Sequence, residues 1–421
     1  MKKLLIFLVC LISLPMCDGV QAQTWHDARD GGYHVFGLGW SRSSLRKYQR
    51  LPTAERSLIG NTNLSNNSLL SSGLYVRFRT DANAISISYV MTKSATQHYF
   101  VSTFGQSGVD LYARSDDGKT YHWLAPHVGN AGFSSPATAN YRNIIPANME
   151  GNKVCEYVLY LPSLNGVNSL KVGTNTDAET FEWIEAPEEF DGIVAYGGGT
   201  VQGASASHPG NTWTNIVGRA LDLPVVNLGF MGMAQLDKGV FDVMAELKPQ
   251  AFIIDAMPDM LSNIDDIVDR VLAGVKTLRA VNQRPILLVE SPGTPDKLIR
   301  PDVQALHTAA NAKLKEAYDQ LISEGYHNIF YMTEEEIGLT DDDFVDGIDV
   351  NDLGMKRYAE VYLQKLAYIE ENKEDLLDAI DRVEAPVKEN GATYDLNGRR
   401  VGDNLQKGIY IRNGKKFAVT E

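Results

Sequence analysis

Residues 196–210 form the first stretch whose composition suits a binding loop, because it is rich in glycine and small residues. A glycine-rich turn between a strand and a helix can cradle the phosphates of a dinucleotide. The spacing does not fit that role. Gly197 and Gly199 are not followed by a third glycine three residues further on, and the second strand ends in Asn227 and Leu228 instead of an acidic residue. The loop also lacks the Gly-Lys-Ser/Thr run of a nucleoside triphosphate site, so we expect no nucleotide here.

The elements that must position this loop are five apolar runs, each followed by a helix-like segment. The runs end near residues 196, 228, 255, 289 and 332. The helix-like segments lie near residues 212–221, 236–247, 264–281, 302–324 and from about 352. This alternation predicts a three-layer α/β domain over residues 189–371, with a doubly wound, flavodoxin-like parallel sheet. Ligands of such sheets bind at the carboxyl ends of the strands, so the loops after the five runs should carry any chemistry.

Residues 23–188 have a different rhythm and predict an all-β sandwich, or jelly roll. Short runs such as 74–78, 84–89 and 154–160 alternate or are rich in β-branched and aromatic residues, and no window of helical length has a period of 3.6. This part contains four aromatic residues of interest, Trp25, Trp40, Tyr48 and Trp123. If their rings are exposed they can stack on sugars; otherwise they belong to the core and its rim. Residues 372–421 predict a connector and a β-hairpin tail with two Asn-Gly turns. This tail resembles short C-terminal modules of exported proteins from polysaccharide-degrading Gram-negative bacteria.

Five sequence blocks, in order along the chain and at or near predicted strand ends, resemble those of the SGNH (GDSL-type) hydrolases. They are YG (196–197) with QGASASHPG (202–210), NLGFMG (227–232), IDAMPDM (254–260), ILLVE (286–290) and VDGIDVNDLG (345–354). The resemblance covers about residues 51–366 and is strongest to exported bacterial members that carry a jelly roll before the esterase domain. Members with known substrates include carbohydrate acetylesterases. The resemblance therefore implies the SGNH hydrolase fold and a carbohydrate or acylated carbohydrate as ligand.

The resemblance also implies which positions should do the chemistry. These hydrolases use a Ser nucleophile, a His held by an Asp, and an oxyanion hole built from a backbone N–H, a Gly and an Asn. In this chain the nucleophile position is Gly199, the His position is Asp349 and the Asn position is Asp259. Only Gly232, in the oxyanion hole, and Asp346, the triad Asp, match the pattern.

Loss of the nucleophile or the base costs a serine hydrolase about a factor of a million in turnover. We therefore predict a carbohydrate-binding pseudo-esterase that is inactive or severely impaired as a Ser esterase. A hydrolase with a rewired Asp-based or metal-assisted site and a structural or partner-binding surface protein are the alternatives. Ser291, at the end of the fourth strand, is a possible displaced nucleophile, but the sequence shows no partner for it.

The acidic residues at the former catalytic positions suggest a further hypothesis. Asp259, Asp346 and Asp349 should converge there, and carboxylates in close proximity either share protons or recruit a cation with oxygen ligands. A Ca²⁺ or Mg²⁺ site is thus one reading, and a solvated relic of the triad is the other; no other cofactor is expected. His208 and Met231 are further candidates for ligand contact. The acidic runs 334–336 and 341–343 predict a solvated loop.

The N-terminal 22 residues have the pattern of a secretory signal peptide. Lys2 and Lys3 precede an apolar run at 4–14 and a small-residue cleavage site before Gln23, and the run is too short to span a membrane. A lipoprotein signal with Cys17 as the acylated residue is the alternative. We expect an exported protein, whether periplasmic, on the cell surface or secreted, with no transmembrane span in the mature chain.

Charge and cysteine content narrow the possible partners and cross-links. The chain has 39 Lys and Arg against 53 Asp and Glu, a net charge of −14, which argues against a nucleic-acid partner because phosphate binding needs a basic surface. Of its 3 cysteines, only Cys155 would remain after cleavage, so the mature chain should have no intrachain disulfide.

Overall fold

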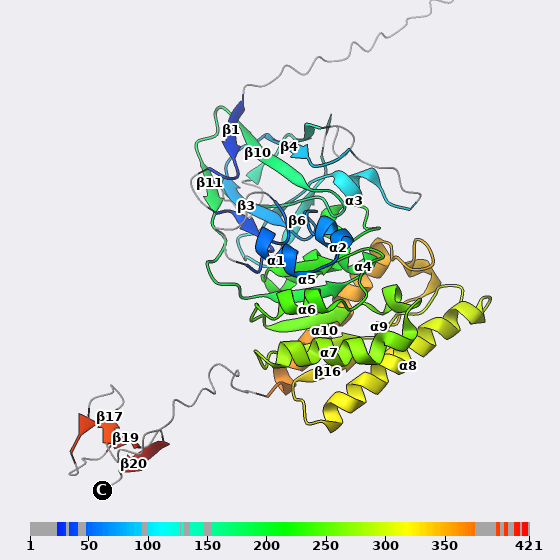
Figure 1. Cartoon of the computed structure of the whole chain (residues 1–421). Helices are drawn as coiled ribbons and strands as arrows, with labels where there is room; N and C mark the ends of the chain where they lie inside the picture. Colours follow the sequence, from blue (N-terminus) through cyan, green and yellow to red (C-terminus); the bar gives the residue numbers. More distant parts are fainter. Residues whose placement is uncertain are drawn as a thin grey trace, which may run out of the picture.

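A computed structural model of the chain describes residues 23–30, 33–40, 48–94, 100–126, 128–129, 135–146 and 153–374, and in the C-terminal part residues 393–395, 400–402, 408–412 and 415–419 (Figure 1). The first part is antiparallel β-structure and the second is a parallel sheet between helices, so the predicted fold class is confirmed. The predicted signal peptide, its cleavage site and Cys17 lie outside the described residues. No helix in these described ranges is long and apolar enough to cross a membrane.

Two antiparallel sheets form the N-terminal sandwich. The first has the order β1-β10-β4-β8-β7 and the second the order β11-β3-β9-β5-β6, with β2 paired to β3. Alternate residues point inward, as in β3, so that the two inner faces meet in one apolar core. The strands are β1 (Gln23–Asp27), β2 (Val35–Phe36), β3 (Tyr75–Thr80), β4 (Ile85–Met91), β5 (Asp110–Arg114), β6 (Tyr121–Leu124), β7 (Val128–Gly129), β8 (Ala137–Tyr141), β9 (Cys155–Tyr160), β10 (Val167–Asn175) and β11 (Phe181–Ile184).

Three short helices in this part were not predicted from the sequence. They are α1 (Thr53–Leu58), α2 (Thr62–Asn67) and α3 (Thr103–Ser107), with 6, 6 and 5 residues. Fewer than two turns cannot display a period of 3.6, so hydrophobic patterning does not reveal them. A capping residue is the sequence signal that reveals α2: the Asn61 side chain accepts the N–H groups of Asn63 and Leu64 at the start of this helix.

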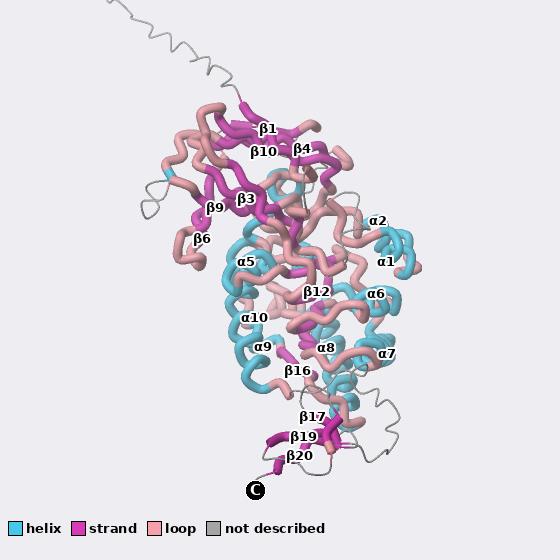
Figure 2. Tube along the Cα trace, turned by 90° about the vertical axis from the view of Figure 1, so that its left-hand side faces the viewer, coloured by secondary structure: helices cyan, strands magenta, loops and turns pink. Residues whose placement is uncertain are grey.

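The α/β part has a five-stranded parallel sheet in the order β13-β12-β14-β15-β16, which is the flavodoxin-like order. Successive residues of each strand face opposite layers. Val194 and Tyr196 of β12 pack toward α6–α8, whereas Ile193 and Ala195 pack toward α5 and α10. Figure 2 shows the two helical layers on either side of the sheet. The elements are β12 (Ile193–Gly197), α4 (Gly199–Gln202), α5 (Trp213–Leu221), β13 (Val225–Gly229), α6 (Lys238–Met244), β14 (Ala251–Asp255), α7 (Ile267–Arg279), β15 (Ile286–Val289), α8 (Pro301–Ser323), β16 (Ile329–Met332), α9 (Glu334–Ile337) and α10 (Asp352–Asn372), with short 3₁₀ turns η3 (Pro209–Asn211), η4 (Met257–Met260), η5 (Ile264–Asp266) and η6 (Asp341–Asp343).

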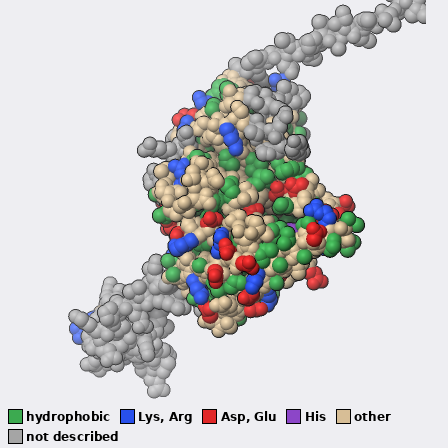
Figure 3. Space-filling view, turned by 45° about the vertical axis from the view of Figure 1, so that its right-hand side comes forward, with side chains coloured by type: hydrophobic (Ala, Val, Ile, Leu, Met, Phe, Trp, Pro, Cys, Tyr) green, Lys and Arg blue, Asp and Glu red, His purple; other side chains and the backbone are tan. Residues whose placement is uncertain are grey.

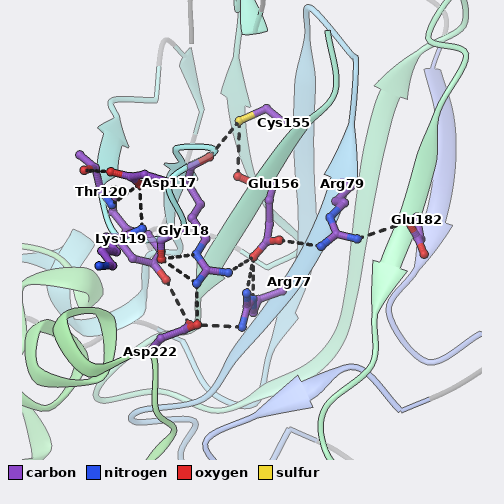
Figure 4. A network of polar contacts seen from close by, with 12 residues as sticks. Arg77, Arg79, Asp117, Gly118, Lys119, Thr120, Cys155, Glu156, Glu182 and Asp222 are labelled. Atoms are coloured by element: carbon purple, nitrogen blue, oxygen red, sulfur yellow. Dashed lines mark hydrogen bonds and ion pairs between the residues drawn. The ribbon is translucent and has the colours of Figure 1, made fainter. Parts of the chain in front are cut away.

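Buried charge joins the sandwich to the α/β part. The Arg50 guanidinium is almost fully buried and donates to the carbonyl oxygens of Asn227 (3.1 Å) and Gly229 (2.6 Å) at the end of β13, and to Asn67 at the end of α2. A second network, drawn in Figure 4, places Glu156 of β9 between Arg77 and Arg79 of β3. Arg114 of β5 links this carboxylate to Asp222, which caps the C-terminal end of α5.

Four short antiparallel strands form a separate sheet near the C-terminus, in the order β18-β17-β19-β20. They are β17 (Thr393–Asp395), β18 (Arg400–Val401), β19 (Gly408–Arg412) and β20 (Lys415–Val419). These strands lie in the segment for which the sequence predicts a β-hairpin tail. Its two Asn-Gly turns and the connector over residues 375–392 lie outside the described residues.

Candidate functional site

The site is built around the end of β12, where the strand turns into α4. The carbonyl oxygen of Gly197 accepts the N–H of Phe230 (2.8 Å), which ties this turn to the loop after β13. A Cβ at Gly197 would overlap the carbonyl oxygen of Asp255 at the end of β14, so only glycine lets the two strand ends approach so closely. The turn therefore presents Gly198 and Gly199 between the ends of β13 and β14.

Asp349 lies directly over Gly199, the residue that we predict at the nucleophile position. A Cβ built on Gly199 would collide with Asp349 Oδ1. Asp349 is buried, with 5% of its surface exposed, and it comes from the loop that leads into α10. That loop is shaped by Asp346, whose Oδ1 accepts the N–H groups of Ile348 (2.8 Å) and Asp349 (2.7 Å). Asp346 thus holds the turn that aims Asp349 at the glycine.

Asp259 lies over the neighbouring Gly198. A Cβ built on Gly198 would be 2.6 Å from Asp259 Oδ1. The other oxygen, Oδ2, accepts the Ala234 N–H (2.8 Å), and the N–H groups of Gly232 and Met233 also bond to this carboxyl group. Gly232 has φ +70°, which favours glycine and curls the loop around the carboxyl group. An internal carboxyl group therefore uses the N–H donors of the 232–234 turn.

Burial raises the pKa of these carboxyl groups because water no longer solvates the charged form. The pKa of Asp349 rises to about 7, with the charges of Asp346 and Asp259 adding to the effect of burial. Burial raises the pKa of Asp259 to about 6, although the three N–H groups of the 232–234 turn act in the opposite direction. Both groups therefore exchange protons near neutral pH.

A third buried carboxyl group, Asp255 at the end of β14, was not singled out from the sequence. Burial raises its pKa to about 7, partly offset by the Tyr362 hydroxyl of α10, which donates to Oδ2 (2.8 Å). The available signal was one acidic residue at the end of the otherwise apolar run AFIID (251–255). That run is buried at every position, so its aspartate is buried too.

The predicted metal site on Asp259, Asp346 and Asp349 does not assemble. Asp346 Oδ1 already accepts the N–H groups of Ile348 and Asp349. In the ranges that the structure describes, no group of three or more His, Cys, Asp or Glu residues is placed to hold a metal ion.

Comparisons with known proteins agree with this geometry. Residues 191–367 match the model of the GDSL-like lipase/acylhydrolase family, and residues 23–180 match the GxDLY domain, described as the N-terminus of SGNH-hydrolase-type esterases. Residues 191–367 thus form a domain of the GDSL-like lipase/acylhydrolase family. No curated protein matches it.

Three solved structures share the fold of this chain, each aligned over 83% of it. A protein from Bacteroides ovatus described as a GDSL-like lipase is 24% identical with a TM-score of 0.71, over 98% of its own length. The salicylyl acyltransferase SsfX3 from a tetracycline biosynthetic pathway is 16% identical with a TM-score of 0.62, also over 98% of its length. A family two carbohydrate esterase from Cellvibrio japonicus is 12% identical with a TM-score of 0.50, over 99% of its length.

The name-giving GxDLY motif of the N-terminal domain reads GVDLY at residues 108–112 and anchors His208. Its Asp110 is fully buried; Oδ2 accepts the Gly210 N–H (2.8 Å) and bonds to His208 Nδ1, while Oδ1 accepts Trp123 Nε1. The Trp123 ring also stacks on His208, with the ring centres 4.8 Å apart. These contacts hold His208 at the junction of sandwich and α/β part, and its partners are not the carboxyl groups around Gly199. Sequence reasoning had no means to see this pairing across 98 residues.

The remaining candidates, Met231 and Ser291, both make contacts within the protein. Met231 is half-buried; its N–H donates to Gln202 Oε1 (2.8 Å) and its side chain packs on a small apolar cluster with Val101 and Leu164. Ser291 does have a partner: its hydroxyl lies 2.6 Å from His307 Nδ1 of α8. Both residues are at most 1% exposed, so this pair fastens the loop after β15 to α8 and offers no reactive hydroxyl to a substrate.

The acidic runs 334–336 and 341–343 are largely exposed, as predicted, but they form short helices and not a loop. Residues 334–337 form α9 and residues 341–343 form η6, each begun by a threonine capping box, at Thr333 and Thr340. Asp343 is fully buried, bonds to Thr340 and pairs with Arg357 (3.1 Å). Capping threonines three residues before an acidic side chain are the sequence signal for such short helices.

Proposed function

We propose that this chain is an exported, carbohydrate-binding member of the GDSL-like family that has lost serine-esterase chemistry. The observation that carries the proposal is the environment of Gly199. A glycine at the start of α4 has no atom that can attack an ester, and the Asp349 carboxyl group occupies the space that a side chain there would need.

The second support is the use of the oxyanion donors. In the family mechanism, N–H groups near Gly232 stabilise the charge that develops on the ester oxygen, a contribution of roughly 10²–10³ per donor. Here the Asp259 carboxyl group accepts those N–H groups. Above about pH 7 it would also place negative charge where negative charge must develop. Loss of the nucleophile alone removes about a factor of a million in turnover.

A carbohydrate suits the polar groups that remain. Carboxyl groups with pKa values of about 6 and 7 accept a hydrogen bond when ionised and donate one when protonated, which matches the donor and acceptor character of sugar hydroxyls. The shared fold with a carbohydrate esterase supports the same class. A polyanionic ligand is disfavoured by the net charge of −14, and Figure 3 shows acidic and basic side chains intermingled over the α/β part.

Binding and hydrolysis assays on one set of ligands test the proposal. The purified chain should bind acetylated or unmodified oligosaccharides in calorimetry and release no acetate above the buffer rate. Asp259→Asn with Asp349→Asn should weaken that binding at least tenfold, whereas Asp341→Asn, an exposed acid in η6, should leave it unchanged. Binding that the double variant does not alter would contradict the proposed site.

The same carboxyl groups favour one alternative, a hydrolase with Asp-based acid/base chemistry, because pKa values near neutrality suit general acid and base catalysis. This alternative predicts a bell-shaped pH–rate profile with limbs near pH 6 and 7. Asp349→Asn should abolish the rate. If the native chain releases no product across pH 4–9, the alternative fails.

A further inference from the structure

A cavity of about 770 Å³ opens in the β-sandwich, away from the carboxyl groups of the α/β part. Its walls come from the β5–β6 hairpin and from the segment that follows β8. The volume lies within the range of about 300–1,000 Å³ that is typical of small-molecule sites. The side chains that matter for recognition are His122, Trp123, Tyr141, Arg142 and Asn143.

Trp123 is a rigid aromatic surface at this cavity. The indole ring stacks on the His208 ring, with an angle of 18° between the two rings. The indole Nε1 donates a hydrogen bond to Asp110, which is fully buried. Even so, 45% of Trp123 is exposed. An aromatic ring fixed by its neighbours and still open to solvent can stack on a flat apolar surface with little loss of conformational entropy.

The rest of the wall is polar and partly unsatisfied. The Tyr141 hydroxyl is buried and has no hydrogen-bond partner among the described residues. His122 bonds through Nε2 to the Ser115 hydroxyl (3.1 Å). Asn143 adopts the left-handed conformation, with φ 56°, which asparagine tolerates better than most residues.

We propose that this cavity binds a pyranose unit of a neutral oligosaccharide, as a second ligand site that is independent of the centre around Gly199. A pyranose ring presents an apolar C–H face and several hydroxyls. The C–H face fits the open side of Trp123, and the hydroxyls match the imidazole and amide groups of the wall. The Trp123–His208 stack makes this site part of the junction between the sandwich and the α/β part.

The test is calorimetric titration of the purified chain with hexasaccharides of β-1,4-glucan, β-1,4-xylan and β-1,4-mannan. At least one should bind, and Trp123→Ala should raise its Kd at least tenfold. Trp25→Ala is the matched control, because Trp25 is equally exposed (44%) but lies in β1 of the other sheet; its Kd should equal that of the native chain.

Tyr141→Phe is a second control, because it removes only a buried hydroxyl that the ligand does not touch. The melting temperature should stay unchanged or rise, and the Kd should equal that of the native chain. Asn143→Gly removes the amide and keeps the left-handed backbone, and should weaken binding.

Three outcomes would overturn the inference: no hexasaccharide binds at millimolar concentration, the Trp123 and Asn143 variants bind like the native chain, or Asp259→Asn with Asp349→Asn alone removes all binding. The last result would assign the carbohydrate to the Gly199 centre and leave the proposed function standing. Conversely, loss of binding in the Trp123 and Asn143 variants alone would support the cavity and count against ligand binding at that centre.

Discussion

At the scale of single residues, the carboxyl groups of Asp255, Asp259 and Asp349 make the fold sensitive to pH in an unusual direction. Their pKa values in the folded chain, about 7, 6 and 7, lie above the ordinary value of 3.8. The folded state therefore binds more protons than the unfolded state between about pH 4 and 7. By linkage, these groups lower the free energy of unfolding as the pH rises through that window.

Asp349→Asn should therefore stabilise the chain at pH 8, because the amide keeps the shape of the side chain without a buried charge. We expect a rise in melting temperature of several degrees at pH 8 that shrinks toward zero near pH 4, measured by thermal unfolding at both pH values. Asp341→Asn is the control, since this side chain is exposed. A variant that melts below the native chain at pH 8 would show that the Asp349 charge is compensated in the fold.

At the scale of elements, the end of β13 depends on one buried cation from the other part of the chain. Arg50→Met should lower the free energy of unfolding by about 2–4 kcal/mol, because the carbonyl oxygens of Asn227 and Gly229 lose their donor. Denaturant unfolding measures this directly. Arg79→Met, at a half-exposed guanidinium, should cost less than about 1 kcal/mol. Equal effects of the two variants would mean that Arg50 does not hold the strand end.

The ion network of Figure 4 gives a second prediction for the junction. Glu156 accepts hydrogen bonds from Arg77, Arg79 and Arg114. Burial raises its pKa, but Arg77 and Arg114 outweigh burial and lower it. Its contribution to stability is therefore present above the ordinary pKa of 4.5 and is lost as the pH falls through the lowered value. Glu156→Gln should destabilise the chain at pH 7 by about 1–3 kcal/mol and much less near pH 3.

The control for this prediction is Glu182→Gln. Glu182 is largely exposed, and its ion pair with Arg79 is long, at 3.8 Å. It should change the free energy of unfolding by less than about 1 kcal/mol. A Glu156 variant whose loss of stability is the same at pH 3 and pH 7 would show that packing, and not charge, accounts for the effect.

At the scale of the whole molecule, local patterns predict the layers, and long-range contacts decide the site. The apolar runs that became β12–β16 and the helices between them follow from periodicity and from the covering of both sheet faces. The burial of Asp255 and the pairings of Asp110 with His208 and of Ser291 with His307 depend on residues distant in sequence, so patterning could not reveal them. Motif blocks located Asp259 and Asp349, but only the structure shows that they lie over Gly198 and Gly199.

The central claim is that this scaffold keeps esterase geometry around a position that lacks its nucleophile. Gly199→Ser alone should not restore activity, because the new side chain would meet the Asp349 carboxyl group. The triple variant Gly199→Ser, Asp259→Asn and Asp349→His replaces all three obstacles. Its matched control is the double variant Asp259→Asn and Asp349→His, which lacks only the nucleophile.

The most direct measurement is hydrolysis of p-nitrophenyl acetate by the native chain, the double variant and the triple variant, each verified as folded. We predict no rate above buffer for the native chain and the double variant, and a measurable turnover for the triple variant. A native chain that already hydrolyses the ester, or a folded triple variant no faster than the double variant, would contradict the account.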